Sequence, residues 1–433
     1  MKRISFVLLA ALLMTACNPN TPDLPKDAHV GTQMQKSAKR GACFDFKDPT
    51  DMALMTDAIS WYYNWGSKPS ADAAYWFELN GVDFCPMCWN GSYSKDLIRN
   101  YVAEHPSTKY LLAFNEPNLT DQANMVPSKA AELWPDVVAL AKELNLKLVA
   151  PAMNYGTLAG YHDPIKWMDE FLQQPDVSLG DIDAMALHCY MTSVGGVVSF
   201  VESFYKYNKP IWMTEICAWD AGSHQPGSLG DQMSYMTTVL NYFEQNERVE
   251  RYAWFMPRTK SSITSYPFMQ LLTHDEPAEL TELGKIHNRF SSFDKSTYFD
   301  LSKPVYAGCY VGLSDNTIPV RVSPEDNEHL VISPLSMNEW TEYNVYAPES
   351  LSALNVRYAT LVKSRIAIDV DGTEGEEFQV TSSGGMDVWG DMQVPVKLSK
   401  GYHTIRVRVT SGGFNFGWLA NNTIEYSNYS GLK

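Results

Sequence analysis

Short apolar runs alternate with amphipathic stretches along the chain between about residue 40 and residue 290. The runs are continuous in apolar character and bounded by turn residues, as in strands that are buried on both faces of a parallel sheet. They cover residues 41–46, 59–65, 82–89, 110–115, 147–153, 184–190, 210–215 and 252–256. The pattern therefore predicts a series of eight buried strands.

Helical patterns fill the spaces between these runs. The clearest covers residues 128–146, where Ser128 is a plausible N-cap and apolar residues recur at helical spacing. A second such pattern covers 230–246, and weaker patterns cover 51–58, 71–79, 95–104, 165–172, 197–207 and 279–290. Eight strands that are each followed by a helix predict a (β/α)8 TIM barrel over residues 40–292. A doubly wound open sheet is the alternative, but no glycine-rich phosphate loop supports it.

The period of the pattern changes after about residue 300. Short runs with period-two alternation replace the long apolar runs, and turn residues separate them. They cover 318–322, 330–333, 342–346, 353–358, 365–370, 393–398 and 403–409. We therefore expect an all-β sandwich over residues 305–433, joined to the barrel by residues 291–304.

The N-terminus has the features of a targeting segment. Lys2-Arg3 precedes a short apolar stretch over 6–13, which is too short to span a bilayer. Met14-Thr15-Ala16-Cys17 then resembles a bacterial lipobox. We expect residues 1–17 to be a lipoprotein signal peptide with Cys17 lipidated, and residues 18–39 to be a flexible tether. The protein would then be held at the bacterial cell envelope. The alternative is an ordinary secretory signal with an incidental cysteine.

Charge and composition narrow the range of partners. The formal net charge of -16 over 433 residues argues against nucleic-acid binding, because phosphates would be repelled. Aromatic residues make up 12% of the chain, and neutral sugars stack on aromatic faces. An acidic surface that only improves solubility explains the charge equally well. We expect a monomer.

The cysteines give a weaker signal. Cys85-Pro86-Met87-Cys88 has the spacing of a metal or redox motif, but no second cysteine or histidine pair accompanies it. We expect these thiols to be mostly buried strand residues, with one disulfide possible in an exported protein.

Two glutamates follow apolar runs in short polar phrases. Glu116 ends Phe114-Asn115-Glu116, and Glu215 ends Met213-Thr214-Glu215. In a (β/α)8 barrel the C-terminal ends of the strands meet at one face, so the two carboxylates should share a cleft. Glycoside hydrolysis needs one carboxyl group to protonate the leaving oxygen and another to attack or to activate water. A single glutamate at a strand end is usually a surface residue, but this pair favours a glycosidase.

Other polar and aromatic residues end strands of the same series and should converge on that cleft. For each tryptophan the alternative is core packing, and for the histidine it is a structural role. The residues are Tyr63, Trp65, Trp89, Asn154, His188, Tyr190 and Trp254.

Several of these phrases carry a resemblance to a known family. Residues 40 to about 258 resemble glycoside hydrolase family 128, barrel enzymes of the retaining clan A that cleave β-1,3-glucans. The most specific phrase is Trp61-Tyr62-Tyr63-Asn64-Trp65, whereas an Asn-Glu pair alone marks much of the clan. The remaining matches are residues 39–41, 86–89, 114–117, 187–190, 209–215 and 250–255.

The resemblance implies a role for each site residue. Glu116 would be the general acid/base and Glu215 the nucleophile, while Asn115 would hydrogen-bond the 2-hydroxyl of the sugar that is cleaved. No metal or organic cofactor is implied. His188 and Tyr190 would frame the nucleophile, Trp254 would form an apolar floor, and Tyr63, Trp65 and Trp89 would line the subsites. Two departures from the family pattern, Cys88 and Ile216-Cys217, affect the expected shape of the subsites.

Residues from about 305 to 420 resemble a family 6-type carbohydrate-binding module. Members bind sugar with two facing aromatic residues and an asparagine, which map onto Tyr343, Trp389 and Asn415. Trp340 and Trp418 are expected in the core. The alternative is a structural sandwich without a sugar site.

We therefore predict a retaining, endo-acting glycoside hydrolase that cleaves β-1,3-glucan by double displacement. Glu116 needs a raised pKa to act as an acid, and Glu215 must stay ionised. Two alternatives remain open. One is a non-catalytic surface glycan-binding lipoprotein on a degenerate barrel. The other is a clan A hydrolase that acts on xylan or mannan. The sequence does not separate endo from exo action.

Overall fold

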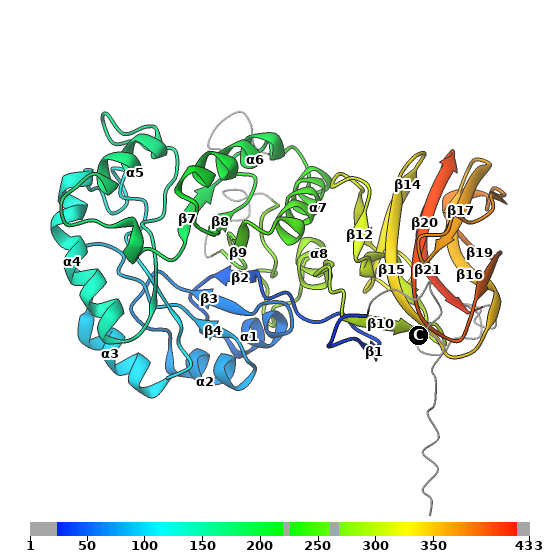
Figure 1. Cartoon of the computed structure of the whole chain (residues 1–433), viewed down its shortest axis with the longest axis horizontal. Helices are drawn as coiled ribbons and strands as arrows, with labels where there is room; N and C mark the ends of the chain where they lie inside the picture. The colour runs from blue at the N-terminus through cyan, green and yellow to red at the C-terminus, as the bar shows by residue number, and fades with distance from the viewer. Residues whose placement is uncertain (1–23, 220–225, 260–267, 422–433) are drawn as a thin grey trace, which may run out of the picture.

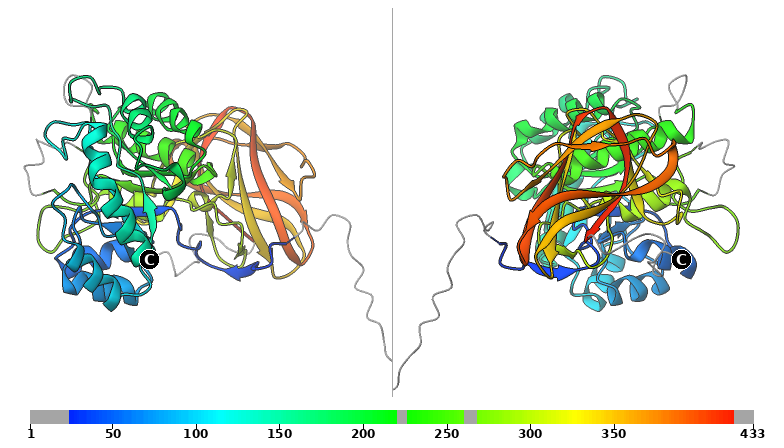
Figure 2. Two further views of the ribbon diagram at one scale, coloured as in Figure 1. Left: turned by 60° about the vertical axis from the view of Figure 1, so that its left-hand side comes forward. Right: turned by 90° about the vertical axis from the view of Figure 1, so that its right-hand side faces the viewer.

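The computed structural model describes residues 24–219, 226–259 and 268–421, which form two domains side by side (Figure 1). An N-terminal domain of alternating strands and helices is followed by a C-terminal domain of strands. Two further views show the helices of the first domain packed beside the sandwich-like layers of the second (Figure 2).

Parallel strands form the centre of the N-terminal domain. Six of them make one sheet in the order β4-β3-β2-β9-β8-β7, and β5 and β6 pair in a second sheet. Isolated parallel bridges join the two sheets, Met87 to Leu112 and Val149 to Ala184. The strands are β2 (Arg40–Cys43), β3 (Trp61–Tyr63), β4 (Asp83–Phe84), β5 (Tyr110–Leu112), β6 (Lys147–Val149), β7 (Met185–Cys189), β8 (Ile211–Ile216) and β9 (Val249–Trp254).

All eight predicted strands are therefore present, in the neighbour order that a (β/α)8 barrel requires. The ladders themselves form two sheets rather than one continuous closed sheet. A fully closed barrel remains a prediction.

A helix follows each strand, and helices cover the outside of the strands (Figure 1). They are α1 (Pro49–Thr56), α2 (Ala71–Leu79), α3 (Lys95–Glu104), α4 (Pro127–Glu143), α5 (Pro164–Leu172), α6 (Val194–Ser203), α7 (Leu229–Gln245) and α8 (Glu282–Arg289), with 3-10 turns η1 (Leu179–Asp181) and η2 (Phe204–Tyr207). The prediction of Ser128 as the N-cap of α4 is wrong. Val126 is the cap residue, it makes no side-chain capping bond, and Pro127 opens the helix.

The cysteines are buried and free in the part of the chain that the structure describes, Cys309 being partly buried. Cys85 packs in the smaller apolar cluster inside the strands with Trp61 and Trp212, whereas Cys88 packs in the larger cluster. The two thiols of the Cys-Pro-Met-Cys motif therefore lie in different environments and do not form a ligand pair. Burial raises the pKa of Cys85 to about 12, which makes it a poor nucleophile.

The C-terminal domain consists of two sheets. One has the order β1-β10-β15-β20-β17-β18 with β12 on β15, and the other has the order β13-β14-β21-β16-β19 with β11 on β21. The strands are β1 (His29–Gly31), β10 (Thr297–Asp300), β11 (Val305–Tyr306), β12 (Gly312–Leu313), β13 (Val320–Val322), β14 (Leu330–Ser336), β15 (Trp340–Ala347), β16 (Leu351–Thr360), β17 (Ser364–Val370), β18 (Phe378–Val380), β19 (Gly385–Leu398), β20 (Gly401–Ser411) and β21 (Gly413–Asn421), with the 3-10 turn η3 (Ala307–Cys309).

Two of these strands lie in segments that were expected to be linkers. β10 falls within residues 291–304 and pairs in parallel with β15. β1 falls within residues 18–39 and pairs in parallel with β10, where it lies at the edge of the sandwich in both views of Figure 2. The expectation of a tether without structure is therefore wrong for His29–Gly31.

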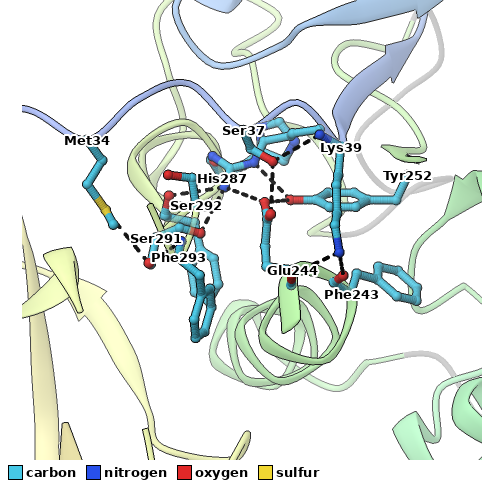
Figure 3. A network of polar contacts seen from close by, with 12 residues as sticks. Met34, Ser37, Lys39, Phe243, Glu244, Tyr252, His287, Ser291, Ser292 and Phe293 are labelled. Carbon is cyan, nitrogen blue, oxygen red and sulfur yellow. Dashed lines mark hydrogen bonds and ion pairs between the residues drawn. The ribbon is translucent and has the colours of Figure 1, made fainter. Parts of the chain in front are cut away.

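A buried polar network lies in the N-terminal domain where it meets the C-terminal domain (Figure 3). Arg40 is 2% exposed. Its guanidinium donates to Glu244 at 3.1 Å and to the main-chain oxygens of His287, Phe290 and Ser291 at 2.7–3.2 Å. Glu244 also accepts the hydroxyls of Tyr252 at 2.6 Å and Ser37 at 2.9 Å.

The network continues into the sandwich. Ser291 donates to the main-chain oxygen of Tyr310, whose hydroxyl donates to Asn241 of α7 at 2.8 Å. Buried and hydrogen-bonded groups therefore link the two domains.

None of the described helices is both long and apolar enough to cross a membrane.

Candidate active site

Glu116 and Glu215 lie together at the C-terminal ends of two strands. Glu116 follows β5 by four residues, and Glu215 is the penultimate residue of β8. The two residues are 5% and 4% exposed. An oxygen of each carboxylate and a ring nitrogen of His188 all lie within 4.8 Å of one another. The structure therefore confirms that these two carboxylates share one site.

Glu116 sits on an unusual backbone. Its φ angle is 44°, in the left-handed region that residues with a side chain rarely adopt. Its main-chain oxygen accepts from Leu119 at 3.0 Å, which closes a turn directly after the strand. Backbone strain of this kind is concentrated at functional sites.

Three donors surround the carboxylate of Glu215. The hydroxyl of Tyr63 donates at 3.0 Å and the indole N–H of Trp65 at 2.8 Å to one oxygen. The hydroxyl of Tyr190 donates to the other oxygen. These contacts fix both the position and the rotation of the carboxylate. Donors of this kind favour its ionised form.

Glu116 has a different set of partners. The Nδ1 atom of His188 lies 3.0 Å from one of its oxygens, and Asn154 donates an amide N–H to the same oxygen at 3.0 Å. The same Nδ1 atom lies 3.5 Å from Glu215. His188 is fully buried, and its Nε2 atom has no hydrogen-bond partner among the described residues. One imidazole therefore bridges both carboxylates.

These contacts set the direction of each pKa. Burial raises the pKa of Glu116, but the charge of His188 and the hydrogen bonds from His188 and Asn154 outweigh it, so the net direction is down. Burial and the charge of Glu116 raise the pKa of Glu215 against the opposing effects of His188, Tyr190 and Trp65. Burial lowers the pKa of His188, but the two carboxylates outweigh it and raise that pKa.

The expected raised pKa of Glu116 is therefore wrong for this arrangement of the site. The physical reason is that His188 faces Glu116 more closely than Glu215. The three groups titrate as one coupled set, in which a proton can be held by His188 or by either carboxylate.

Asn115 lies beside the pair with an open acceptor. It is 3% exposed, and its amide N–H donates to Gln122 at 3.0 Å. Its Oδ1 atom has no partner among the described residues. A buried acceptor of this kind is suited to the hydroxyl group of a ligand, because it would otherwise remain unsatisfied.

Aromatic rings line the Glu215 side of the site. Phe255 packs edge-on against Trp65 and Tyr190, with ring centroids 6.2 Å and 5.3 Å apart, and lies parallel to Trp219 at 6.2 Å. Trp65, Tyr190 and Phe255 are partly buried, as is Trp219. We call these four residues the aromatic wall.

Only Trp65 and Tyr190 of this wall were predicted from the sequence as site residues. Phe255 lies in the run that was assigned to the last strand, and Trp219 follows Glu215 by four residues, so proximity in sequence was the available signal. Asn154 was recognised as a strand-end residue, but its bond to Glu116 was not predicted.

Trp89 and Trp254 differ in position. Trp89 is partly buried, and its main-chain oxygen accepts from Asn115 at 2.9 Å. Trp254 is fully buried, and its indole N–H donates to the main-chain oxygen of Met269 at 2.8 Å. It exposes no ring face, so the prediction that it forms a floor in contact with sugar is wrong in this structure.

Glu116, His188 and Glu215 are also a set of side chains that could hold a metal ion, given their spacing. Both oxygens of Glu215, one oxygen of Glu116 and the Nδ1 atom are already engaged with hydrogen-bond donors or with one another. A metal ion would have to displace these contacts, whereas proton transfer uses them as they are.

The residues predicted to bind sugar in the sandwich are only partly accessible. Tyr343 is fully buried, and its hydroxyl donates to the main-chain oxygen of Ala307 at 2.8 Å, so its prediction as a sugar contact is wrong. Alternation along β15 points the side chain of Tyr343 into the core, where its ring packs edge-on against Phe416.

The other aromatic and amide residues of this domain differ in burial. Asn415 is 1% exposed, and Trp389 is partly buried. Trp418 is in the core as expected. Trp340 is only partly buried, and Arg406 lies over its ring.

Comparisons with known proteins agree with this geometry. The family model described as glycosyl hydrolase catalytic core matches residues 41–287, which is more than half of the chain. The β/α domain is therefore a glycosyl hydrolase catalytic core, and its two buried carboxylates are the expected equipment of such an enzyme.

The solved structures define the family more closely. The chain is similar to a GH128 subgroup II endo-β-1,3-glucanase from Pseudomonas viridiflava, with 37% identity over 58% of this chain and 97% of that chain and a TM-score of 0.53. A GH128 subgroup II endo-β-1,3-glucanase from Sorangium cellulosum is 32% identical, over 57% of this chain and 97% of that one, with a TM-score of 0.50. The chain belongs to glycoside hydrolase family 128.

Two further comparisons concern the C-terminal domain and a more distant relative. Residues 315–421 match the carbohydrate-binding module of family 35, where a family 6 resemblance was expected. A curated relative, alkali-sensitive linkage protein 1 of Schizosaccharomyces pombe, is 26% identical over 216 residues. That match covers 48% of this chain and only 36% of the relative, so the chain spans about a third of that protein.

Proposed function

We propose that this protein is a retaining endo-β-1,3-glucanase. The observation that carries the proposal is the buried pair Glu116 and Glu215, with an oxygen of each within 4.8 Å of the other. Retaining glycosidases hold their carboxyl groups about 5–5.5 Å apart, whereas inverting enzymes leave about 6.5–9.5 Å for a water molecule. Two carboxylates with oxygens this close to each other match the retaining arrangement better than the inverting one.

In the proposed mechanism Glu215 attacks the anomeric carbon while Glu116 protonates the leaving oxygen. The C1–O bond to the leaving sugar breaks, and an ester forms between C1 and Glu215. Glu116 then deprotonates a water molecule, which attacks C1 and releases Glu215. Two displacements at C1 give net retention of configuration.

His188 has a place in this cycle. It lies 3.0 Å from Glu116, close enough to pass its Nδ1 proton to that carboxylate. Transfer leaves a neutral imidazole and a protonated Glu116, which is the form that can act as an acid. Glu215 keeps its three donors, which orient the oxygen that attacks.

The substrate class is supported by the relatives and by the side chains around the pair. Both subgroup II structures are endo-β-1,3-glucanases by description. Asn115 offers its free Oδ1 to a sugar hydroxyl. Tyr63, Trp65 and Tyr190 bond to Glu215, and the main-chain oxygen of Trp89 bonds to Asn115. The aromatic wall provides rings for packing against sugar.

A panel of polysaccharides tests the proposal. Linear and β-1,6-branched β-1,3-glucans should release reducing sugar, and xylan and mannan should not. Size analysis of early products should show a ladder of oligosaccharides, as internal cleavage requires, and NMR of the first product should show the β-anomer. Hydrolysis of mannan or xylan without hydrolysis of β-1,3-glucan would overturn the substrate assignment. Binding without hydrolysis would favour a glycan-binding protein.

We also propose that the sandwich binds β-glucan at a site near Trp389. Its family 35 match supports sugar binding as a class. Trp389 packs beside Gly417, and both its indole N–H and the Oδ1 atom of Asn415 lack partners among the described residues. The test uses the full chain with Glu215→Gln, which removes hydrolysis, and compares it with the same chain carrying Trp389→Ala. Equal retardation of both in glucan-containing gels would show that Trp389 has no part in binding.

The N-terminal segment supports a proposal about location. We infer from Met14-Thr15-Ala16-Cys17 that Cys17 carries lipid and holds the protein, as a monomer, at the bacterial cell envelope. Cys17 lies outside the described residues. Fractionation of cells that express wild type or Cys17→Ser tests the anchor, and wild type found wholly in the soluble exported fraction would refute it. Light scattering of the protein without residues 1–17 tests the monomer.

A further inference from the structure

We propose that Tyr155 forms a sugar-binding platform for the leaving-group side of the substrate. The proposal rests on the proposed β-1,3-glucanase function and goes beyond it by assigning a residue to the departing part of the chain. Tyr155 is 55% exposed, although the polar residue directly before it contacts the acid/base carboxylate.

The main chain around Tyr155 is held on both sides. The main-chain oxygen of Asn154 accepts the amide of Asn118 at 2.6 Å, and Asn118 is fully buried. The N–H of Gly156 donates to the main-chain oxygen of His162 at 3.0 Å. A Cβ atom on Gly156 would lie 2.4 Å from the main-chain oxygen of Asn118, so only glycine permits this close approach.

The ring of Tyr155 is also supported. Phe200 of α6 is buried, and its ring centroid lies 5.2 Å from that of Tyr155 with the planes at 39°. Packing against Phe200 occupies part of the ring and leaves more than half of the side chain exposed. An aromatic ring that is already fixed binds sugar without the entropy cost of ordering a mobile side chain.

The contacts of the two carboxylates decide which side of the cleft Tyr155 serves. The aromatic wall is joined to Glu215 through Trp65 and Tyr190, which both donate to it. Tyr155 is joined to Glu116 through Asn154, its neighbour in the chain. Glu215 must lie beneath the sugar that is retained, whereas Glu116 delivers its proton to the oxygen that departs. Because Asn154 bonds to Glu116, the exposed ring that follows Asn154 in the chain is assigned to the side of the departing sugars.

A comparison of two substrates isolates this role. The first is a β-1,3-linked glucose oligosaccharide, whose leaving group consists of sugars. The second is an aryl β-glycoside of the same oligosaccharide, whose leaving group is a phenol. Values of kcat/KM are measured on both with the full chain as wild type, Tyr155→Ala and Tyr155→Phe. Tyr75→Ala is the matched control, because Tyr75 is 70% exposed on α2.

For Tyr155→Ala we expect the ratio of kcat/KM on the oligosaccharide to kcat/KM on the aryl glycoside to fall about tenfold, as loss of one stacking ring predicts. Tyr155→Phe keeps the ring and should stay within about threefold of wild type, because it loses at most one hydrogen bond. Tyr75→Ala should leave both substrates unchanged.

Transfer reactions give an independent readout. An added β-1,3-linked acceptor must enter the leaving-group side, where Glu116 deprotonates its attacking hydroxyl and the bond between C1 and Glu215 breaks as the new C1–O bond forms. Tyr155→Ala should therefore lower the yield of transfer products relative to hydrolysis.

The outcomes separate the two proposals. An unchanged ratio and an unchanged transfer yield in Tyr155→Ala would overturn the platform and leave the glucanase standing. Equal losses on both substrates would also overturn it, because they would indicate that the variant disturbs Asn154 and Glu116. No hydrolysis of either substrate by wild type would instead reject the proposed function.

Discussion

The Nδ1 atom of His188 lies 3.0 Å from a carboxylate oxygen of Glu116 and connects a fully buried imidazole to the predicted acid. The contact explains why the pKa of Glu116 is lowered although burial alone would raise it. It also makes the protonation of the site a property of three groups, since Glu215 lies 3.5 Å from the same nitrogen.

Replacing either carboxylate should remove catalysis while the fold remains. We expect Glu116→Gln and Glu215→Gln each to lower kcat on β-1,3-glucan by at least ~10³, because a general acid or a nucleophile is lost. Thermal unfolding followed by circular dichroism checks that both variants fold. Azide should restore turnover to Glu215→Ala with formation of the α-glycosyl azide. Near wild-type hydrolysis by either Gln variant would reject the assignment.

Removing His188 should move the acidic limb of the pH profile. In His188→Asn the positive charge that lowers the pKa of Glu116 and Glu215 is gone, so both carboxylates should hold protons to higher pH. The ionisation of Glu215 then requires a higher pH, and the acidic limb of kcat/KM should shift upward by about one unit. The profile of kcat/KM from pH 4 to pH 9 measures it. A lower rate with an unmoved acidic limb would mean that His188 acts only through packing.

Breaking the junction network should destabilise the protein strongly. Glu244→Gln leaves the cation of Arg40 buried without its counter-charge, and we expect a loss of ~3 kcal/mol in the free energy of unfolding. Glu143→Gln is the matched control, because its partner Arg99 lies at the surface and the pair is exposed. Urea unfolding compares the two variants with wild type. Equal midpoints for all three would show that the buried pair contributes nothing beyond a surface pair.

His287 should make the protein less stable as the pH falls. Burial and the nearby charge of Arg40 lower the pKa of His287 to about 3, whereas in the unfolded chain it is about 6.5. Between these values the unfolded state takes up a proton that the folded state excludes, so stability is lost on acidification by up to ~1.4 kcal/mol per pH unit. In His287→Gln the free energy of unfolding should depend less on pH, whereas His162→Gln, at an exposed position, should keep the pH dependence of wild type. Urea midpoints at pH 7, 5.5 and 4.5 measure this dependence. The same change of midpoint with pH in wild type and His287→Gln would contradict the prediction.

The C-terminal domain should need residues before 305 for its full stability. A fragment of residues 305–433 lacks β10 and β1, so the edge of β15 that β10 covers would be exposed. We expect residues 294–433 to unfold at a higher temperature than residues 305–433. Circular dichroism melts of the two fragments make the comparison. A cooperative melt of the shorter fragment at the same temperature would show that the added strand is dispensable.

The strands and helices with strong local signals were predictable from sequence. α2 and α3 begin and end where the pattern placed them, because Ser70 and Ser94 cap their first turns with side-chain oxygens. The start of α4 was missed because Val126 and Pro127 provide no such cap. β1 and β10 were missed because strands of three or four residues are too short to show a period.

The candidate site was predictable where a residue followed a strand, and unpredictable where it depended on the direction of a side chain. Glu116 and Glu215 meet because parallel strands end at one face. Tyr343 and Trp389 looked equivalent in sequence, but the alternation of β15 turns Tyr343 inward, and only packing shows which face of a strand is inside. The direction of the pKa of Glu116 likewise depends on His188, which lies 72 residues further along the chain.

The bonds that Ser291 and Tyr310 make across the junction have a consequence for polymeric substrates. They tie the C-terminal domain to α7 and to the end of α8, so two sugar sites on one such body would be separated by a constant span. A glucan shorter than that span could occupy only one site, while a longer one could bridge both and gain effective concentration. The affinity of the whole protein would then rise in a step at one glucan length. The spacing of the two sites would set that length.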